Sequence, residues 1–365
     1  MPAPSDRAGC RVLVCGLGGT IAMGATGSGG VAPSLSAEQL VSAVPGLAET
    51  GIVVEVEDFR RLPGASLTIA DITALAGAVS RRLAEGVDGV VVVQGTDTVE
   101  ESAYLLDLLH PGPQPVVVTG AMRNPTLAGA DGPANLLAAV QVAASAAACD
   151  QGVLVVFAGE IHAARRVRKS HSTSVAAFQS PNGGPLGYLV EGQARLLTRL
   201  GHRTVVPPPS SQRLPRVGLF TVALGEDGAL LHSAADRLDG LVVAAFGAGH
   251  VPGQLVATLG GLAERVPVVL ASRTGGGPVL AATYAFPGSE RDLLARGLVS
   301  AGFLDSFKAR VLLQALLAAG ADRATVVAGF GAAGGYADPD TWPYPPPAPA
   351  AADSGGWTSR CEATN

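Results

Sequence analysis

Charged residues and cysteines are scarce in this sequence, and each scarcity excludes a class of protein. Only 15% of the 365 residues are charged, against 48% hydrophobic residues, which is typical of a soluble globular protein rich in small side chains. The formal net charge of −5 provides no basic surface for nucleic acid. The four cysteines lack CxxC spacing and indicate neither a disulfide framework nor a zinc site.

Long hydrophobic runs are also missing. The N-terminal residues, Met-Pro-Ala-Pro-Ser-Asp-Arg, contain no hydrophobic signal core, and the first apolar run has the length of a strand, which predicts a cytoplasmic location. The one long uncharged segment, from Gly132 to Cys149, contains Pro133 and Asn135 and is mostly alanine. We interpret it as a buried helix, with no membrane as partner.

Strands and helices alternate along the first two hundred residues. This alternation predicts an α/β fold, with a larger N-terminal catalytic domain over residues 10–200 that has a mostly parallel sheet flanked by helices. The predicted strands are 12–15, 52–56, 90–93, 116–119 and 153–157. The predicted helices are 37–44, 69–84, 99–109 and 133–148.

The second part of the chain repeats this alternation on a smaller scale. A Pro/Ser-rich stretch, 201–216, predicts a linker to a smaller C-terminal α/β domain over 217–335. Its predicted strands lie near 217–222, 240–245 and 266–271, and its helices near 253–264 and 305–319. The Pro-rich segment 336–365 predicts a disordered or extended tail without a role in chemistry.

One strand-to-helix turn organises the larger domain. The run Val90–Val93 predicts a parallel strand buried on both faces, and apolar residues recur with the helical period from Val99 to Leu109. Thr98 and Glu101 have the spacing of a capping box. Residues 94–97 then form a turn at the carboxyl end of a strand, where ligands of α/β sheets bind. The alternative is that its polar residues only form the turn and the cap.

A second Gly-Thr turn favours a functional role. Residues 11–22 are again an apolar strand followed by glycines and Thr20, so two hydroxyl groups can share one crevice. A threonine hydroxyl needs a base, and Lys169, in Arg165-Arg-Val-Arg-Lys-Ser170, can be one only if burial keeps it neutral. Spacing alone does not decide this for Lys169, and the three arginines are better explained as a solvated face or an anion patch.

These motifs resemble the bacterial-type L-asparaginase family. The resemblance rests on Gly18-Gly-Thr-Ile-Ala22, on Gly95-Thr-Asp-Thr98 followed by Glu100-Glu-Ser-Ala-Tyr104, and on Thr119-Gly-Ala-Met-Arg123 with Ala130-Asp-Gly-Pro-Ala-Asn-Leu136. It continues to the helix Lys308-Ala-Arg-Val-Leu-Leu313, in the order of the family. The two threonine motifs together are specific, whereas either one alone is weak.

The resemblance implies an amidohydrolase that releases ammonia from L-asparagine, with glutamine as a minor substrate, through an acyl-enzyme on threonine. It assigns Thr20 as the primary nucleophile, Thr96 as a second threonine paired with Lys169, and Asp97 as the carboxylate that binds the substrate α-ammonium group. Gly95 lies in the same ligand-facing turn. The resemblance implies no metal or organic cofactor. It also implies a homo-oligomer, a dimer or tetramer, whose sites are closed across the interface.

The sequence departs from the family pattern in the loop after the first threonine. The family has a tyrosine there that helps to activate the nucleophile, whereas no tyrosine precedes Tyr104 in this chain. Thr26 and Ser28 are the hydroxyl residues of the loop, and neither has an obvious claim to that role. The glycines of the loop are compatible with a lid that orders at an entropic cost.

A second departure concerns the residues that hold the amino-acid end of the substrate. The Ser-Gln pair of the family falls on Gly64 and Ala65, so either Ser66 or the Gly64 backbone N–H takes over the α-carboxylate. The position that the partner subunit supplies falls on His250, and Thr283-Tyr284 replaces an acidic position. Each lost polar partner costs roughly 1–3 kcal/mol of binding, so another primary amide is an alternative substrate.

Two further hypotheses stay open at this stage. One is an amino-acid-binding homologue with little turnover, suggested by the missing tyrosine and by Gly64-Ala65. The other is a dinucleotide-dependent enzyme, suggested by Gly16-Leu-Gly-Gly-Thr20, which lacks the third glycine of GxGxxG at Ile21. Outside these motifs, His162 and His171 are expected to be structural, and Arg123 and Asn124 to support a neighbouring turn.

Overall fold

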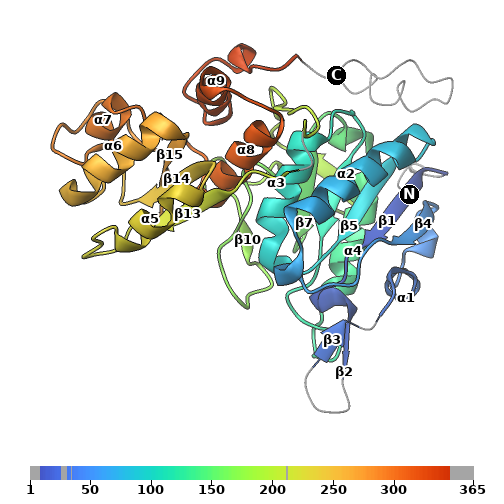
Figure 1. The fold of residues 1–365 in the computed structure, drawn as a ribbon. Coiled ribbons are helices and arrows are strands. Elements are labelled where there is room, and N and C mark those ends of the chain that lie inside the picture. The colour runs from blue at the N-terminus through green and yellow to red at the C-terminus, as the bar shows by residue number, and fades with distance from the viewer. Residues whose placement is uncertain (1–8, 26–30, 34, 211–212, 346–365) are drawn as a thin grey trace. The chain divides into compact units, whose positions relative to one another are not determined.

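The computed structural model describes residues 9–25, 31–33, 35–210 and 213–345. The chain divides into two compact units, a larger one that ends at Arg203 and a smaller one that begins at Thr204. The larger unit has a mixed, mostly parallel sheet and the smaller unit a parallel one, both covered by helices, and Figure 1 labels many of their elements. The two-domain α/β fold expected from the sequence is confirmed.

The larger unit contains an eight-stranded sheet in the order β12-β11-β8-β7-β6-β5-β1-β4. From β4 to β7 the neighbours are parallel, and from β7 to β12 they are antiparallel. The strands are β1 (Arg11–Gly16), β4 (Val53–Asp58), β5 (Gly89–Val93), β6 (Val116–Thr119), β7 (Val153–Phe157), β8 (Glu160–Ala163), β11 (Gly187–Val190) and β12 (Gln193–Leu196).

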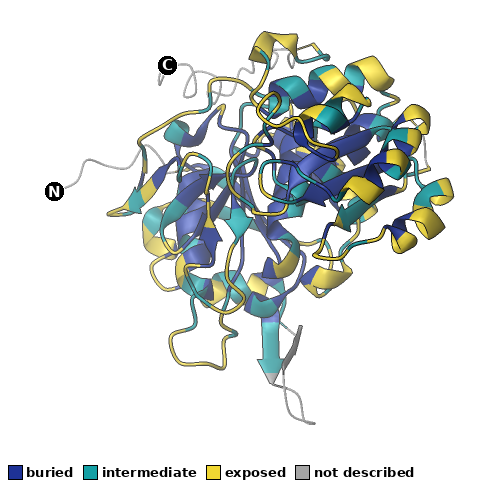
Figure 2. Ribbon diagram, turned by 90° about the vertical axis from the view of Figure 1, so that its left-hand side faces the viewer, coloured by how far each residue is buried: buried dark blue, intermediate teal, exposed yellow. Residues whose placement is uncertain are grey.

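Helices bury both faces of this sheet. Helix α4 (Gly132–Ala143) packs on β5, β6 and β7, in a core with alternate residues of those strands. The intervening strand residues point to the other face, where α3 (Val99–Leu109) packs beside α2 (Ile69–Ala84). Because both faces are covered, β5, β6 and β7 are completely buried, as the dark strands in Figure 2 show.

Short elements complete the larger unit. Two-stranded ribbons are formed by β2 (Met23–Ala25) with β3 (Val31–Pro33), and by β9 (Arg168–Lys169) with β10 (Phe178–Gln179). Helix α1 (Ala37–Ser42) lies beside β4. Single helical turns are η1 (Thr20–Ala22), η2 (Ala48–Thr50), η3 (Gly64–Ser66), η4 (Thr96–Thr98) and η5 (Ala146–Ala148).

The smaller unit has a four-stranded parallel sheet in the order β13-β14-β15-β16. Helices α6 and α7 contribute to one core, whereas α8 packs on β13, β14 and β15, and α9 packs on α8. The elements are β13 (Val217–Thr221), α5 (Ala229–Ala234), η6 (Ala235–Arg237), β14 (Gly240–Ala245), η7 (Gly253–Leu255), α6 (Val256–Arg265), β15 (Val268–Ser272), α7 (Glu290–Ala295), β16 (Val299–Ser300), α8 (Ser306–Ala318) and α9 (Arg323–Ala333).

Three local predictions are corrected. The predicted helix 133–148 ends at Ala143, and η5 follows it. The capping box at Thr98 does not form: the Thr98 side chain accepts no cap hydrogen bond, and its hydroxyl donates to the Gly64 carbonyl at 3.0 Å. The tail is folded from 336 to 345: it contains η8 (Pro339–Thr341), and the Trp342 indole N–H donates to Val205. From residue 346 onward the predicted tail lies outside the described residues.

The uncharged segment that begins at Gly132 is largely a helix buried in the larger unit. Among the described residues, no helix is both long enough and apolar enough to cross a membrane.

Candidate active site

Three turns meet at the carboxyl edge of the large sheet, at Gly19, Gly64 and Gly95. They follow β1, β4 and β5, and these strands are neighbours because β1 lies between the other two. A Cβ atom on Gly19 would lie 2.1 Å from the Gly95 nitrogen, and one on Gly64 would lie 2.8 Å from the Gly95 oxygen. Glycine is therefore needed for these backbones to touch.

Thr20 begins η1 directly after Gly19, whose φ of 91° is in the region that favours glycine. Thr20 is partly buried, and its carbonyl accepts the backbone N–H of Met23. Gly19 contacts Gly95, so the two Gly-Thr turns lie against each other, as the sequence predicts. The β2–β3 ribbon follows Thr20, and the loop positions Thr26 and Ser28 lie outside the described residues.

Lys169 connects the second Gly-Thr turn to the ribbon β9–β10. Its Nζ lies 2.9 Å from the Thr96 Oγ1 and 2.9 Å from the Asp97 Oδ1. The lysine side chain is 14% exposed and Thr96 is 5% exposed, whereas the Asp97 carboxylate is 64% exposed. The Lys169 amine and the Thr96 hydroxyl are thus sheltered, and the Asp97 carboxylate faces solvent, where it can receive a cationic group of a ligand.

Two polar side chains hold this turn: Thr98, for which the sequence predicted a capping role, and Gln94, which the sequence analysis did not single out. The Thr98 hydroxyl joins η4 to Gly64. The fully buried Gln94 donates to the Gly95 carbonyl at 3.3 Å and accepts the Ser102 hydroxyl at 2.8 Å. Gln94 directly follows the apolar strand β5. A polar amide in that position was the available sequence signal, because a buried amide needs hydrogen-bond partners.

Asn135 supports the neighbouring turn after β6. Its amide donates to the Gly120 carbonyl at 3.0 Å and accepts the Ala158 N–H at 3.0 Å. The Asp131 carboxylate accepts the backbone N–H of Arg123 at 2.8 Å. This turn lies against the turn of Gly95, because a Cβ atom on Gly120 would lie 2.4 Å from the backbone carbonyl oxygen of Gln94.

The residues predicted for the substrate carboxylate are in η3. Gly64 is buried against Gly95, whereas Ala65 and Ser66 are exposed. The structure thus brings Gly64 into the cluster of turns. The choice between Ser66 and the Gly64 N–H stays a prediction.

His250 belongs to the smaller unit, in the turn that its bridge with Phe246 closes. Its ring packs edge-on against Tyr284 and Phe286, and its Nε2 lies 3.2 Å from the Glu290 Oε2. Burial opposes ionisation of Glu290, but hydrogen bonds from the backbone N–H of Tyr284 and Thr283 and the nearby His250 keep its carboxyl pKa below the usual value. Contact of His250 with substrate stays a prediction.

Two family models match successive parts of the chain. Residues 11–201 match the family described as Asparaginase, N-terminal, and residues 216–330 match the Glutaminase/Asparaginase C-terminal domain. The chain belongs to the asparaginase family. The threonine, lysine and aspartate positions of the site thus lie within the N-terminal asparaginase match, and His250 lies within the C-terminal one.

Individual relatives extend over most of this asparaginase chain. It is 39% identical over 318 residues to a probable L-asparaginase of Deinococcus radiodurans, covering 86% of this chain and 94% of that protein. It is 35% identical over 323 residues to L-asparaginase 2 of Escherichia coli, covering 84% and 88%. The crystal structure of a probable cytoplasmic L-asparaginase from Campylobacter jejuni superposes with a TM-score of 0.79 at 31% identity, covering 88% and 99%.

Proposed function

We propose that this protein hydrolyses L-asparagine to L-aspartate and ammonia, with Thr20 as the nucleophile and L-glutamine as a minor substrate. The observation that carries the proposal is the contact of Lys169 with both Thr96 and Asp97, 2.9 Å in each case, beside the turn of Thr20. This arrangement combines a hydroxyl group, an amine that can accept a proton and an exposed carboxylate in one family-specific site.

In the first half-reaction the Thr20 oxygen attacks the side-chain amide carbon and loses its proton. The tetrahedral intermediate collapses with transfer of a proton to nitrogen, so ammonia leaves and an ester forms on Thr20. Water then attacks the ester, giving aspartate and restoring the hydroxyl. In this proposal Thr96 and Lys169 relay these protons and Thr20 carries the acyl group.

Asp97 has two roles in the proposal. Its exposed carboxylate binds the substrate α-ammonium group, which fixes the amide near Thr20. The same carboxylate contacts the Lys169 Nζ at 2.9 Å, which helps to hold the amine beside Thr96.

Substitution of the three reacting side chains tests the function. Thr20→Ala, Thr96→Val and Lys169→Met should each lower kcat for L-asparagine by at least about a thousandfold, measured as ammonia release. Lys169→Arg keeps the charge but cannot serve as a base, so it should be equally impaired. The matched control is Thr73→Val, because the Thr73 hydroxyl donates only to its own helix, at Ile69. Undiminished turnover by Thr20→Ala or Thr96→Val would contradict the mechanism.

We further propose a cytoplasmic homo-oligomer, a dimer or tetramer, in which a second subunit supplies His250. The support is the family membership and the position of His250 within the C-terminal family match. Light scattering measures the assembly. A mixture of Thr20→Ala and His250→Ala subunits should recover activity that neither variant has alone, and a fully active monomer would refute this proposal.

A further inference from the structure

Lys169 is one of only two lysines in the chain, the other being Lys308 in the smaller unit. It lies on β9, a strand of two residues whose one pairing partner among the described residues is the equally short β10. Such a ribbon has too few backbone hydrogen bonds to hold a side chain in a fixed position by itself. The position of the Lys169 amine must therefore depend on what the ribbon packs against.

The ribbon is anchored to the large sheet by an aromatic pair. Phe178 is the register partner of Lys169, and its ring stacks on Phe157 of β7 with 4.2 Å between centroids. Both rings are almost completely buried. In the sheet Phe157 pairs with Glu160 and Val155 pairs with His162, so these four side chains share the face on which Phe178 lies.

A polar contact lies beside the aromatic pair. The His162 Nδ1 is 3.0 Å from the hydroxyl of Ser180, the residue that follows β10. His162 is 0% exposed and Ser180 is 7% exposed, so water does not replace this hydrogen bond. The His162 Nε2 lies 3.2 Å from the Glu160 Oε2, without the alignment of a hydrogen bond.

The protonation state of His162 is compatible with a lasting hydrogen bond to Ser180. Burial lowers the pKa of His162 to about 4, so the ring is neutral near neutral pH. With its proton on Nε2, towards the Glu160 carboxylate, the ring accepts the Ser180 hydroxyl at Nδ1; this tautomer is assigned from the two partners. Ser180 then has one well-defined partner.

We propose that the Ser180–His162 hydrogen bond is a positioning device for Lys169, which fixes the ribbon β9–β10 so that the amine reaches Thr96. Ser180 and His162 act through Lys169 and do not touch the substrate. The kinetic part of this proposal rests on the proposed function, whereas the position of the amine can be measured without it.

The kinetic test compares two serines of the same ribbon. Ser180→Ala should lower kcat about tenfold and change KM by less than about twofold, because proton transfer depends on the amine geometry more than binding does. Ser180→Thr, which retains the hydroxyl, should restore most of kcat. Ser174→Ala is the control, because the Ser174 hydroxyl only accepts the N–H of Ala176 within the exposed loop.

Three additional variants separate positioning from general stability. In the Lys169→Met background, Ser180→Ala should cause no further loss of the residual activity, since both act through one amine. His162→Asn can still accept the Ser180 hydroxyl and should retain more activity than His162→Leu. An equal loss from Ser180→Ala in both backgrounds would overturn the proposal.

Nuclear magnetic resonance of isotope-labelled lysine reports the chemical environment of the Lys169 amine directly. The spectrum of the full chain contains one side-chain signal each for Lys169 and Lys308. Ser180→Ala should shift the Lys169 signal and leave that of Lys308 unchanged. If folded Ser180→Ala protein shows a lower melting temperature but an unchanged Lys169 signal and kcat, the contact is only structural and the proposal fails. A shifted signal in a protein without any ammonia release would support the positioning and reject the proposed function.

Discussion

At the scale of single residues, the lack of space between three backbones determines which residues can stand at the centre of the site. Gly19, Gly64 and Gly95 have backbones so close that no side chain fits between them. Each is next to a residue proposed to contact the substrate or its amide, so any displacement moves reacting groups. The glycines thus determine where the backbones of Thr20 and Thr96 lie relative to each other.

A pair of glycine substitutions tests this. Gly64→Ala should lower kcat/KM at least about tenfold, because its Cβ atom would lie 2.8 Å from the Gly95 oxygen and the turns must separate. Gly77→Ala is the control: Gly77 lies in α2 with open space around its Cα, so the change should stabilise the helix by about 0.5–1 kcal/mol and leave activity unchanged. Steady-state kinetics and urea unfolding measure both. Similar activity of the two variants would show that the contact is not needed.

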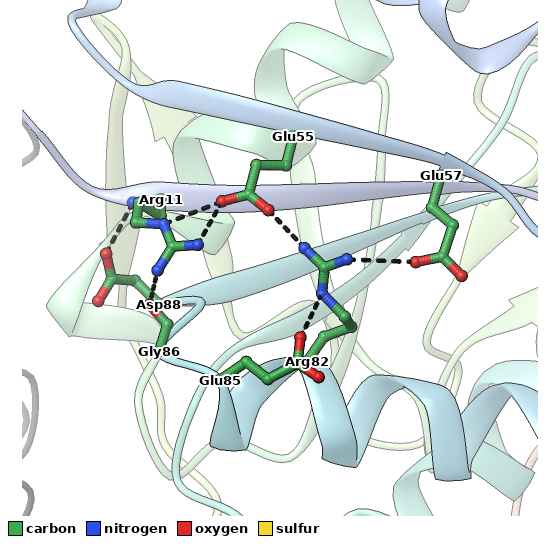
Figure 3. Close-up of polar contacts among 7 residues, drawn as sticks. All are labelled: Arg11, Glu55, Glu57, Arg82, Glu85, Gly86 and Asp88. Atoms are coloured by element: carbon green, nitrogen blue, oxygen red, sulfur yellow. Dashed lines mark hydrogen bonds and ion pairs between the residues drawn. The ribbon is translucent and has the colours of Figure 1, made fainter.

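At the scale of elements, strand β4 shows how the edge of the large sheet is protected. Glu55 and Glu57 project from it towards Arg82 of α2, and Figure 3 shows Arg82 between these carboxylates and Glu85. Arg11 of β1 binds the other oxygen of Glu55 at 2.7 Å. Charged side chains along an exposed edge oppose pairing with another chain, and Arg82 compensates their mutual repulsion.

Loss of Arg82 should therefore remove an ion pair from both Glu55 and Glu57, and leave Glu55 with Arg11. Arg82→Ala should lower the free energy of unfolding by about 1–2 kcal/mol, a modest value because the side chain is 24% exposed and water screens the charges. The difference should shrink in 1 M salt. Arg81→Ala removes the neighbouring exposed arginine and should change stability by less than about 0.5 kcal/mol. Equal effects in urea titrations would show that the network does not stabilise the edge.

The central elements could be predicted from the sequence because they are buried on both faces. Strands β6, β7 and β14, and helices α2 and α3, have the predicted ends. Elements whose conformation depends on tertiary contacts were missed. Helix α9 contains Gly329 and Gly331, which lower helix propensity, and it is held by packing of Gly329 on Leu316. The hydroxyl of Thr98 has a capping pattern in sequence but a distant partner in space.

The candidate site followed from the sequence in part. The sequence predicted that two Gly-Thr turns lie together at strand ends, and the family resemblance supplied Lys169 as the partner of Thr96. Local sequence could not supply Asn135 or Ser180, because Asn135 contacts a backbone carbonyl 15 residues away and Ser180 contacts a ring 18 residues away. Gln94 contacts the adjacent Gly95, and its role depends on its burial. The substrate roles of Gly64, Ala65, Ser66 and His250 remain predictions.

At the scale of the whole molecule, two buried imidazoles make stability depend on pH. Burial, together with the charge of Arg203, lowers the pKa of His110 to about 4, and burial lowers that of His162 to about 4, from 6.5. Between pH 6.5 and 4 the unfolded chain therefore binds more protons than the folded chain. The free energy of unfolding falls as the pH falls through this window, by about 1–3 kcal/mol for each imidazole.

Urea unfolding at pH 7 and pH 5 measures this dependence. His110→Gln should reduce the loss of stability between the two pH values, because one of the two buried imidazoles is absent. The exposed His232 provides the matched control, and His232→Gln should leave the pH dependence unchanged. An unaltered slope in His110→Gln would show that this imidazole is not responsible.

The meeting of three turns at Gly19, Gly64 and Gly95 also constrains how the protein folds. These contacts join segments far apart in the chain, and they require β1 to be paired with both β4 and β5. Helices such as α2 can form from local contacts well before such pairing is complete. During refolding, a chain can therefore regain its helical circular dichroism before the site has formed. The proposed activity should return only in molecules whose central sheet is fully assembled.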